Sequence, residues 1–317
     1  MKKIFIIALL AVAISSFVFT GCTDSGNQNS QDKITISGAF ALYPMMIAWS
    51  EEYNKINPDV KIDISAGGAG KGMTDALSGM VDIGMVSREI YPEEEEKGAL
   101  WVPVAKDAVV GTINAENPII SEIKKKGLSS SILKSLYVDN SYDSWGELYS
   151  GVESDKQVNV YTRSDACGAA SVWAQFMGYE QEDLQGTGVN GDPGVAEAVK
   201  ADTLGVGYNN INFAYDFETG LPIKGIEIIP LDINNNGIID PEEDFYETRD
   251  ELIKAISEGK YPSPPARDLN LVTLSEFKGA TKDFVLWIMT DGQKYVPENG
   301  YLSLSEEKIS EELLKIK

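Results

Sequence analysis

The sequence predicts an α/β fold of two domains in which helices cover a mostly parallel sheet. Its 317 residues are enough for two domains. Strand and helix patterns alternate in the order βαβαβ over residues 33–86, as expected of parallel strands joined by helical crossovers. In addition, three turns of small residues each follow a strand pattern and precede a helix pattern.

The first 22 residues have the pattern of an export signal. Lys2 and Lys3 give a basic start, residues 4–19 form an apolar run, and the segment ends at Cys22. The run is shorter than the ~20 apolar residues that a membrane-spanning helix needs. The small residues before Cys22 resemble a lipobox, which implies a lipid-modified cysteine at the mature N-terminus. A plain signal peptide with an incidental cysteine is the alternative. Residues 23–32 are nearly all polar and predict a flexible tether.

The elements of the body follow from apolar periodicity and turn residues. Pro44 stands where a helix would begin, and the apolar residues after it recur on one helical stripe. In the first part we expect strands at Lys33–Ser37, Val60–Ile64 and Val81–Val86, and helices at Pro44–Ile56 and Gly72–Met80. Farther along we expect strands at Ala108–Asn114, Val158–Thr162, Val206–Tyr208 and Gly225–Pro230, and helices at Gly168–Met177, Val195–Lys200, Glu243–Ile256 and Phe284–Ile288.

Composition excludes several classes of function. The chain has no histidine and only two cysteines, Cys22 and Cys167. Catalysis by Ser-His-Asp or Cys-His groups is therefore excluded, and a zinc site of the usual ligands is nearly so. No other catalytic group is evident, so we expect a protein that is not an enzyme. The net charge of −22 excludes a nucleic-acid binder. The acidic runs at 93–96 and 305–312 are expected to be solvated surface.

The three turns are candidate anion sites. They span residues 37–41, 66–72 and 163–169. A turn of this kind exposes backbone N–H groups at the start of a helix, where an anion is stabilised. The second turn is not a nucleotide-binding P-loop, because Ser65 stands at its first glycine position and Gly72 follows Lys71.

Arginine is scarce, and two of the four arginines lie beside the turns. Arg163 opens the third turn, and Arg88 ends the strand that follows the second. A guanidinium can donate two parallel hydrogen bonds to an oxyanion. Asp165, two residues after Arg163, could pair with it and fix its orientation. Both arginines could instead form structural salt bridges.

The turns, taken in order, resemble those of the phosphate-binding proteins of ABC transporters. The resemblance rests on residues 37–44, 68–72, 81–84 and 163–169, and extends over nearly all of 33–305. It implies a two-lobed periplasmic-binding-protein fold of type 2, with a hinge and a ligand cleft between the lobes. Lobe I would comprise 33–108 plus 263–317, and lobe II 109–262. The ligand-binding residues it implies are Ala39, Phe40, Ala41, Ala69, Gly70, Arg88, Arg163, Asp165, Cys167, Gly168 and Ala169.

The resemblance implies a lipoprotein on the outer face of the cytoplasmic membrane. It would be a monomer, anchored only through its lipid, that delivers phosphate to the permease subunits of an ABC importer. The family usually places hydroxyl groups on the anion, but the matching positions here are Phe40, Ala69, Cys167 and Ala169. Another oxyanion (sulfate, molybdate or tungstate) is therefore an alternative, as is a lipoprotein serving signalling or adhesion.

Two positions, 88 and 165, bear on which anion is bound. The proton-accepting aspartate of the family is matched by Arg88. Asp165 is the remaining acid in the turns, and it either accepts a phosphate proton or is held by Arg163. In the second case we expect poor discrimination between phosphate and sulfate, because backbone N–H groups and arginine only donate.

A calcium loop of the EF-hand type is predicted at 232–243. The ligands would be Asp232, Asn234, Asn236, the Ile238 carbonyl, Asp240 and Glu243, with Gly237 at the sharp turn. A strand pattern precedes the loop, so this is half of an EF-hand. We expect a structural Ca²⁺ that stabilises the lobe or hinge, and an Asn-rich turn without metal is the alternative.

Overall fold

The computed structural model describes residues 32–149, 151 and 154–316. The predicted signal, Cys22 and nearly all of the predicted tether lie outside these residues. Within the described part, no helix has the length and apolar character that crossing a membrane would require.

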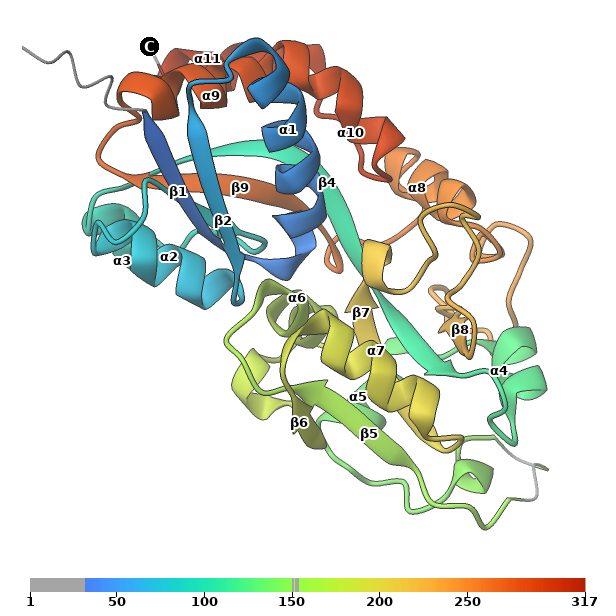
Figure 1. Cartoon of the computed structure of the whole chain (residues 1–317). Helices are drawn as coiled ribbons and strands as arrows, with labels where there is room; N and C mark the ends of the chain where they lie inside the picture. Colours follow the sequence, from blue (N-terminus) through green and yellow to red (C-terminus); the bar gives the residue numbers. More distant parts are fainter. Residues whose placement is uncertain (1–31, 150, 152–153, 317) are drawn as a thin grey trace, which may run out of the picture. The chain divides into compact units, whose positions relative to one another are not determined.

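The strands form one sheet in the order β2-β1-β3-β9-β4-β7-β5-β6, with β8 paired to β4 (Figure 1). Their bounds are β1 Lys33–Gly38, β2 Lys61–Ala66, β3 Ile83–Val86, β4 Ala99–Asn114, β5 Asn159–Arg163, β6 Thr187–Val189, β7 Gly205–Asn210, β8 Ile226–Ile229 and β9 Ala266–Leu274. The expected β-strands are therefore present, and β4 begins nine residues earlier than predicted.

The prediction of a mostly parallel sheet is wrong for the middle of this sheet. β1 pairs in parallel with β2 and β3, and β5 with β6 and β7. In contrast, β9 is antiparallel to β3 and β4, and β4 is antiparallel to β7 and β8. The reason is topological. β4 carries the chain from one half of the sheet to the other and β9 brings it back, so the two strands run in opposite directions.

The helices lie at α1 Tyr43–Ile56, α2 Ala69–Leu77, α3 Pro92–Glu96, α4 Ile120–Lys126, α5 Ser130–Tyr137, α6 Gly168–Phe176, α7 Gly191–Ala201, α8 Arg249–Ser257, α9 Gly279–Met289, α10 Tyr295–Glu298 and α11 Glu306–Ile316. The predicted apolar stripe of α1 is buried at Met45, Met46, Trp49 and Tyr53, whereas Ile56 at the end of the stripe is exposed. The helix expected from Glu243 is wrong at its start, because α8 begins only at Arg249. Thr248 and Glu251 form a capping box that fixes this start.

Two large hydrophobic cores divide the described chain, and a smaller cluster lies between α7 and β8. One is built from residues between Ile34 and Ala105 together with those from Leu269 to Ile316. The other is built from residues between Ala108 and Ala266. We call these regions lobe I and lobe II. The chain passes between the cores on β4 and β9, which we call the hinge strands (Figure 1).

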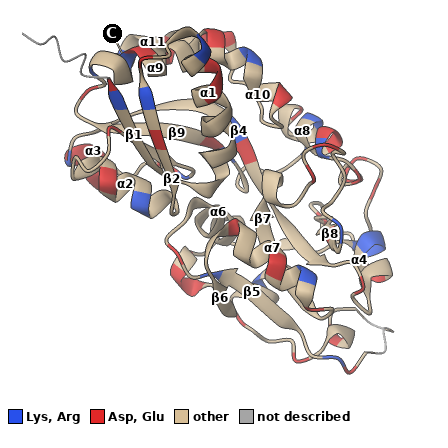
Figure 2. Ribbon diagram, in the orientation of Figure 1, with Lys and Arg blue, Asp and Glu red and all other residues tan. Residues whose placement is uncertain are grey.

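Acidic residues are spread over both lobes (Figure 2). Two of them depart from the prediction that the acidic runs are solvated. Glu94 pairs with Arg88 and its side chain is 13% exposed. Glu312 is 1% exposed and pairs with Lys308 and Lys315. Glu312 is buried and Glu94 is partly buried, and in each case a basic partner compensates for the charge of the carboxylate.

Candidate functional site

The first turn joins β1 to α1 through a short 3-10 helix at Phe40–Leu42. The Ala39 N–H donates to the Met85 carbonyl oxygen at 2.9 Å, so this expected anion donor is already engaged. The N–H groups of Phe40 and Ala41 open the helix, where the chain supplies no intrahelical acceptor. They are the backbone donors that the first turn can offer.

The second turn meets lobe II at its tip. The Gly70 N–H donates to the Ala166 carbonyl oxygen at 3.0 Å, which makes a hydrogen bond between the lobes. Gly68 has a φ of +90°, and a Cβ there would stand 2.8 Å from Oδ2 of Asp165. Glycine is required at this position by both its conformation and its close approach. The Gly70 N–H therefore joins the two lobes. The Ala69 N–H, at the start of α2, is the donor that this turn can still offer to an anion.

The third turn begins α6 and meets lobe I. Cys167 caps the helix by accepting from the Ala170 N–H at 3.4 Å, and the Gly168 and Ala169 N–H groups open it. A Cβ on Gly168 would stand 2.0 Å from the carbonyl oxygen of Ser87. Burial raises the pKa of the Cys167 thiol to about 12, so the group stays protonated and is at most a weak donor.

Arg163 lies at the end of β5 with its side chain 1% exposed. Asp165 accepts from Nε at 2.8 Å and from Nη2 at 2.5 Å, and Asp192 accepts from Nη1 at 2.6 Å. The Phe40 ring lies over the guanidinium at 5.3 Å. A guanidinium has five N–H donors, and these carboxylates use three of them. One donor on each terminal nitrogen therefore remains for an oxyanion.

Asp165 is held by Arg163, which is the second of the two alternatives expected for it. Its Oδ1 also accepts from the Gly191 N–H at 3.0 Å. Burial opposes ionisation of this carboxyl, but the hydrogen bonds and charge of Arg163 outweigh burial and lower its pKa. Asp165 is therefore an ionised group that orients the arginine.

The comparison with protein families decides the class of this chain. A model described as a PBP superfamily domain matches residues 23–291. The chain belongs to the PBP superfamily. The PBP fold of type 2 accounts for the two lobes, the hinge strands and the meeting of the three turns.

Relatives of this PBP chain include two proteins named phosphate-binding protein PstS. The protein from Bacillus subtilis is 24% identical over 98% of this chain and 97% of its own length. The protein from Methanocaldococcus jannaschii is 27% identical over 96% of this chain and 93% of its own length. The similarity therefore extends over essentially whole chains.

Solved structures agree on the PBP fold. A protein of Clostridium perfringens, assigned as a phosphate ABC transporter substrate-binding protein and solved with bound phosphate, has a TM-score of 0.69 at 22% identity. An ABC-type phosphate transport receptor from Vibrio cholerae has a TM-score of 0.60 at 20% identity. Each comparison covers 86% of this chain and all of the other chain.

Arg88 is engaged away from the three turns of the PBP site. Its guanidinium donates to both oxygens of Glu94, at 2.9 and 2.7 Å, and lies 4.1 Å from the centre of the Tyr91 ring. These contacts hold Arg88 against the start of α3. The structure thus brings Arg163 and Asp165 together with the turns, whereas the Arg88 side chain forms an ion pair with Glu94.

Sequence analysis missed a buried polar network behind Arg163. It comprises Asp192, Asn210, Arg267 and Asp107, all of which are buried. Asp192 stands in the first turn of α7, where an acidic residue is ordinarily explained by the helix dipole alone. Asp107 and Arg267 lie on the hinge strands, whose pairing was not predicted. The local sequence therefore carried no signal that these residues meet.

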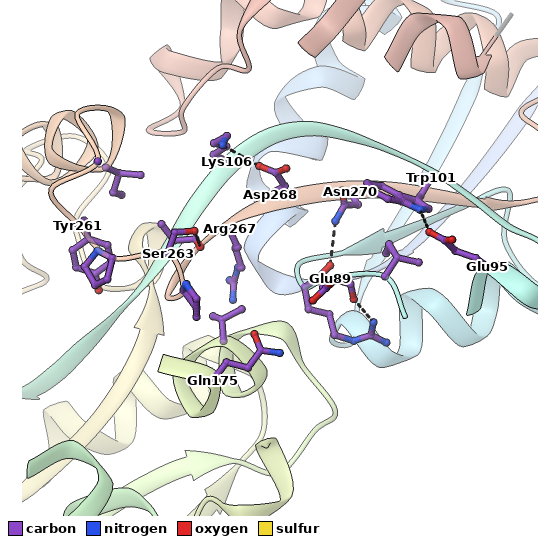
Figure 3. Close-up of a pocket in the computed structure, with 18 residues that line it drawn as sticks. Glu89, Glu95, Trp101, Lys106, Gln175, Tyr261, Ser263, Arg267, Asp268 and Asn270 are labelled. Carbon is purple, nitrogen blue, oxygen red and sulfur yellow. Dashed lines mark hydrogen bonds and ion pairs between the residues drawn. The ribbon is translucent and has the colours of Figure 1, made fainter. Parts of the chain in front are cut away.

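A cavity of about 660 Å³ lies beside the hinge strands (Figure 3). Its wall includes Arg267 and Asn270 from β9, Trp101 and Lys106 from β4, and Gln175 from α6. Among the described residues that line it, none belongs to the three turns. The cavity is therefore separate from the three turns, although its wall includes Arg88, a predicted ligand residue, and Arg267 of the buried network.

The predicted calcium loop is ordered by its own side chains. Asp232 accepts from the Asn236 and Gly237 N–H groups at 3.0 Å each. Glu243 accepts from the Ile233 and Asn234 N–H groups at 2.9 and 3.0 Å. The Asn234 and Asn236 amides both donate to Oδ2 of Asp240. Within the described residues, no three or more His, Cys, Asp or Glu side chains are gathered closely enough to hold a metal ion.

Proposed function

We propose that this PBP chain is an extracytoplasmic binding protein that holds phosphate between its lobes and delivers it to an ABC permease. The observation that carries the proposal is Arg163, a buried guanidinium with two uncommitted N–H donors at the meeting point of three helix-opening turns. Whole-chain similarity to proteins named PstS supports phosphate as the ligand. The role is binding without a chemical step.

Titration calorimetry of purified, ligand-stripped protein tests the proposal. Phosphate, sulfate, molybdate and tungstate would each be titrated under the same buffer and salt. We expect micromolar or tighter binding of phosphate. Binding of another oxyanion with no detectable phosphate binding would overturn the phosphate assignment. Absence of binding to all four would overturn the anion site itself.

A second candidate ligand is an oxyanion that carries no proton, such as sulfate. The observation in its favour is that Asp165 is committed to Arg163 and that Phe40, Ala69, Cys167 and Ala169 lack hydroxyl groups. A site of donors alone cannot satisfy a ligand proton, and an unsatisfied buried proton costs ~1–3 kcal/mol. The same titration series separates the two candidates.

We also propose that the mature protein is a monomer anchored by a lipid on Cys22. The support is the basic start, the apolar run and the small residues before that cysteine. A tether of about ten residues would then leave both lobes free to meet the permease on the outer face of the membrane.

Finally, we propose a structural Ca²⁺ in the loop from Asp232 to Glu243. The support is the spacing of its oxygen-bearing residues and the burial of Asp232 and Glu243, which are 6% and 5% exposed. Asp232, Asn234, Asn236, Asp240 and Glu243 would hold the ion together with the Ile238 carbonyl.

A further inference from the structure

Asp192 is the second carboxylate on the arginine of the candidate site, and it is fully buried. Its Oδ2 accepts from Nη1 of Arg163 at 2.6 Å and from Nδ2 of Asn210 at 2.7 Å. Its Oδ1 accepts from the backbone N–H of Asn210 at 2.8 Å. Three donors thus fix the orientation of this carboxylate, and it in turn fixes the terminal nitrogen of Arg163.

Asn210 connects this carboxylate to the hinge. Its side-chain oxygen accepts a hydrogen bond from Nη2 of Arg267. Arg267 stands directly opposite Asp107 in the pairing of β9 with β4, and its Nη2 lies 3.7 Å from Oδ2 of Asp107. The orientation of Arg163 is therefore tied, through Asp192 and Asn210, to the two strands on which the lobes are joined.

Asp192 also changes the charge that an incoming anion meets. Arg163 carries one positive charge, and Asp165 and Asp192 together carry two negative charges within hydrogen-bonding distance of it. At this burial, solvent and salt screen these charges weakly. Each further negative charge on a ligand is therefore opposed by Asp192.

The other charged or titratable groups facing Asp192 come from several elements. They are Arg163 on β5, Arg267 on β9, Asp107 on β4, Cys167 at the cap of α6 and Tyr301 after α10. Arg163 is the one of these that bonds Asp192 directly among the described residues. Among these groups, Arg163 is therefore the one through which Asp192 affects the bound anion.

We propose that Asp192 is a positioning residue that orients Arg163 and lowers the affinity of the site for doubly charged relative to singly charged oxyanions. This inference rests on the proposed anion-binding function. It differs from a purely structural role, because it predicts a change in the pH dependence of binding and not only a loss of affinity.

The test measures phosphate affinity at about pH 6 and about pH 8, on either side of the range in which phosphate exchanges its second proton. Wild type would be compared with Asp192→Asn, which removes the charge and nearly keeps the shape. The matched control is Asp202→Asn at the other end of α7, where the carboxylate accepts from Asn159 and Tyr161. Melting curves would establish that each variant is folded.

We expect Asp192→Asn to weaken binding at pH 6 and to shift the ratio of the two affinities by about tenfold towards the doubly charged ligand. Sulfate stays doubly charged at pH 6, so the affinity of Asp192→Asn for sulfate should rise relative to its affinity for phosphate at this pH. Asp202→Asn should leave both ratios at the wild-type value. A folded Asp192→Asn protein that binds with the wild-type ratio would overturn the inference while leaving the anion site intact.

Asp192→Glu provides a second arm should Asp192→Asn fail to fold. It keeps the charge but displaces the carboxylate, so we expect lower affinity with an unchanged ratio. Wild-type affinity in Asp192→Glu would contradict the positioning role. Absence of anion binding by the wild type would instead overturn the proposed function, and this inference with it.

Discussion

At the scale of single residues, the site depends on how the donors of Arg163 are shared. Two carboxylates hold the guanidinium and leave one N–H on each terminal nitrogen. Phe40 covers its face from the opposite lobe. A lysine could not reproduce this arrangement, because an ammonium group lacks the planar fork.

Arg163→Ala should weaken phosphate binding by roughly 2–5 kcal/mol, because a buried anion loses its charged partner. Arg163→Lys should recover only part of the loss. Arg88→Ala is the comparison variant, and it should have a smaller effect because Arg88 is bound to Glu94. Calorimetry would measure all three, and full affinity in a folded Arg163→Ala protein would make Arg163 structural.

Asp107 predicts a pH dependence of stability. Burial raises its pKa from 3.8 to about 7, and the positive charge of Arg267 only partly offsets burial. The folded state therefore retains a proton that the unfolded state releases between pH 4 and 7. Stability should fall as pH rises through this window, by up to about 1.4 kcal/mol per pH unit.

Urea unfolding at a series of pH values would measure this effect, with Asp107→Asn as the variant in which the slope should flatten. The chain has no histidine, which removes the commonest competing titration in the upper part of this window. Asp165, whose pKa is lowered, acts in the opposite sense and mainly at lower pH. A wild-type stability that does not change between pH 5 and 7 would contradict the assignment.

At the scale of elements, the loop from Asp232 to Glu243 joins β8 to the segment before α8. It packs against the end of α4 and the connection to α5. The Ile239 N–H donates to the Lys125 carbonyl oxygen of α4 at 2.9 Å, and the Asp232 N–H donates to the Leu128 carbonyl oxygen of the connection at 3.2 Å. Order in this loop therefore supports the packing of lobe II.

Calcium should raise the melting temperature of the protein. Sites of this kind outside the cell bind at about 10⁻⁴ to 10⁻³ M. At a hundredfold excess over the dissociation constant, linkage adds about 2.7 kcal/mol of stability. Glu243→Gln should lose most of that gain, and magnesium at equal concentration serves as the ionic control. Superimposable melting curves in calcium and in chelator would show that the loop is a turn without metal.

At the scale of the whole molecule, the hinge strands join two separate cores and the three turns meet between them. The hydrogen bond from Gly70 to Ala166 joins the lobes, and Gly168 lies so close to Ser87 that no side chain would fit between them. An anion at this junction would contact donors from both lobes.

Cys22→Ser should move the protein from the membrane fraction to the soluble fraction of cells that express it. The reason is that the thiol is the proposed site of lipid attachment, and the described part of the chain holds no helix that could span a membrane. Fractionation and intact-mass analysis would measure the change. Wild-type protein with an unmodified Cys22 would rule the anchor out.

The sequence by itself determined the α/β class, the three turns and the pairing of Arg163 with Asp165. These features are local, because apolar periodicity, small residues at a helix start and a neighbouring carboxylate act within a few residues of one another. Tertiary structure decided which donors stay available. The N–H groups of Ala39 and Gly70 donate to the carbonyl oxygens of Met85 and Ala166, which are distant in the sequence, and are therefore not available to an anion.

Tertiary structure also decided the antiparallel hinge and the role of Asp192. Asp107 and Arg267 are 160 positions apart in number, and only the pairing of β4 with β9 brings them opposite one another. Asp192 reaches Arg163 only because α7 begins beside the end of β5. Pairing of buried charges depends on which strands and helices become neighbours, and no local pattern of residues encodes that choice.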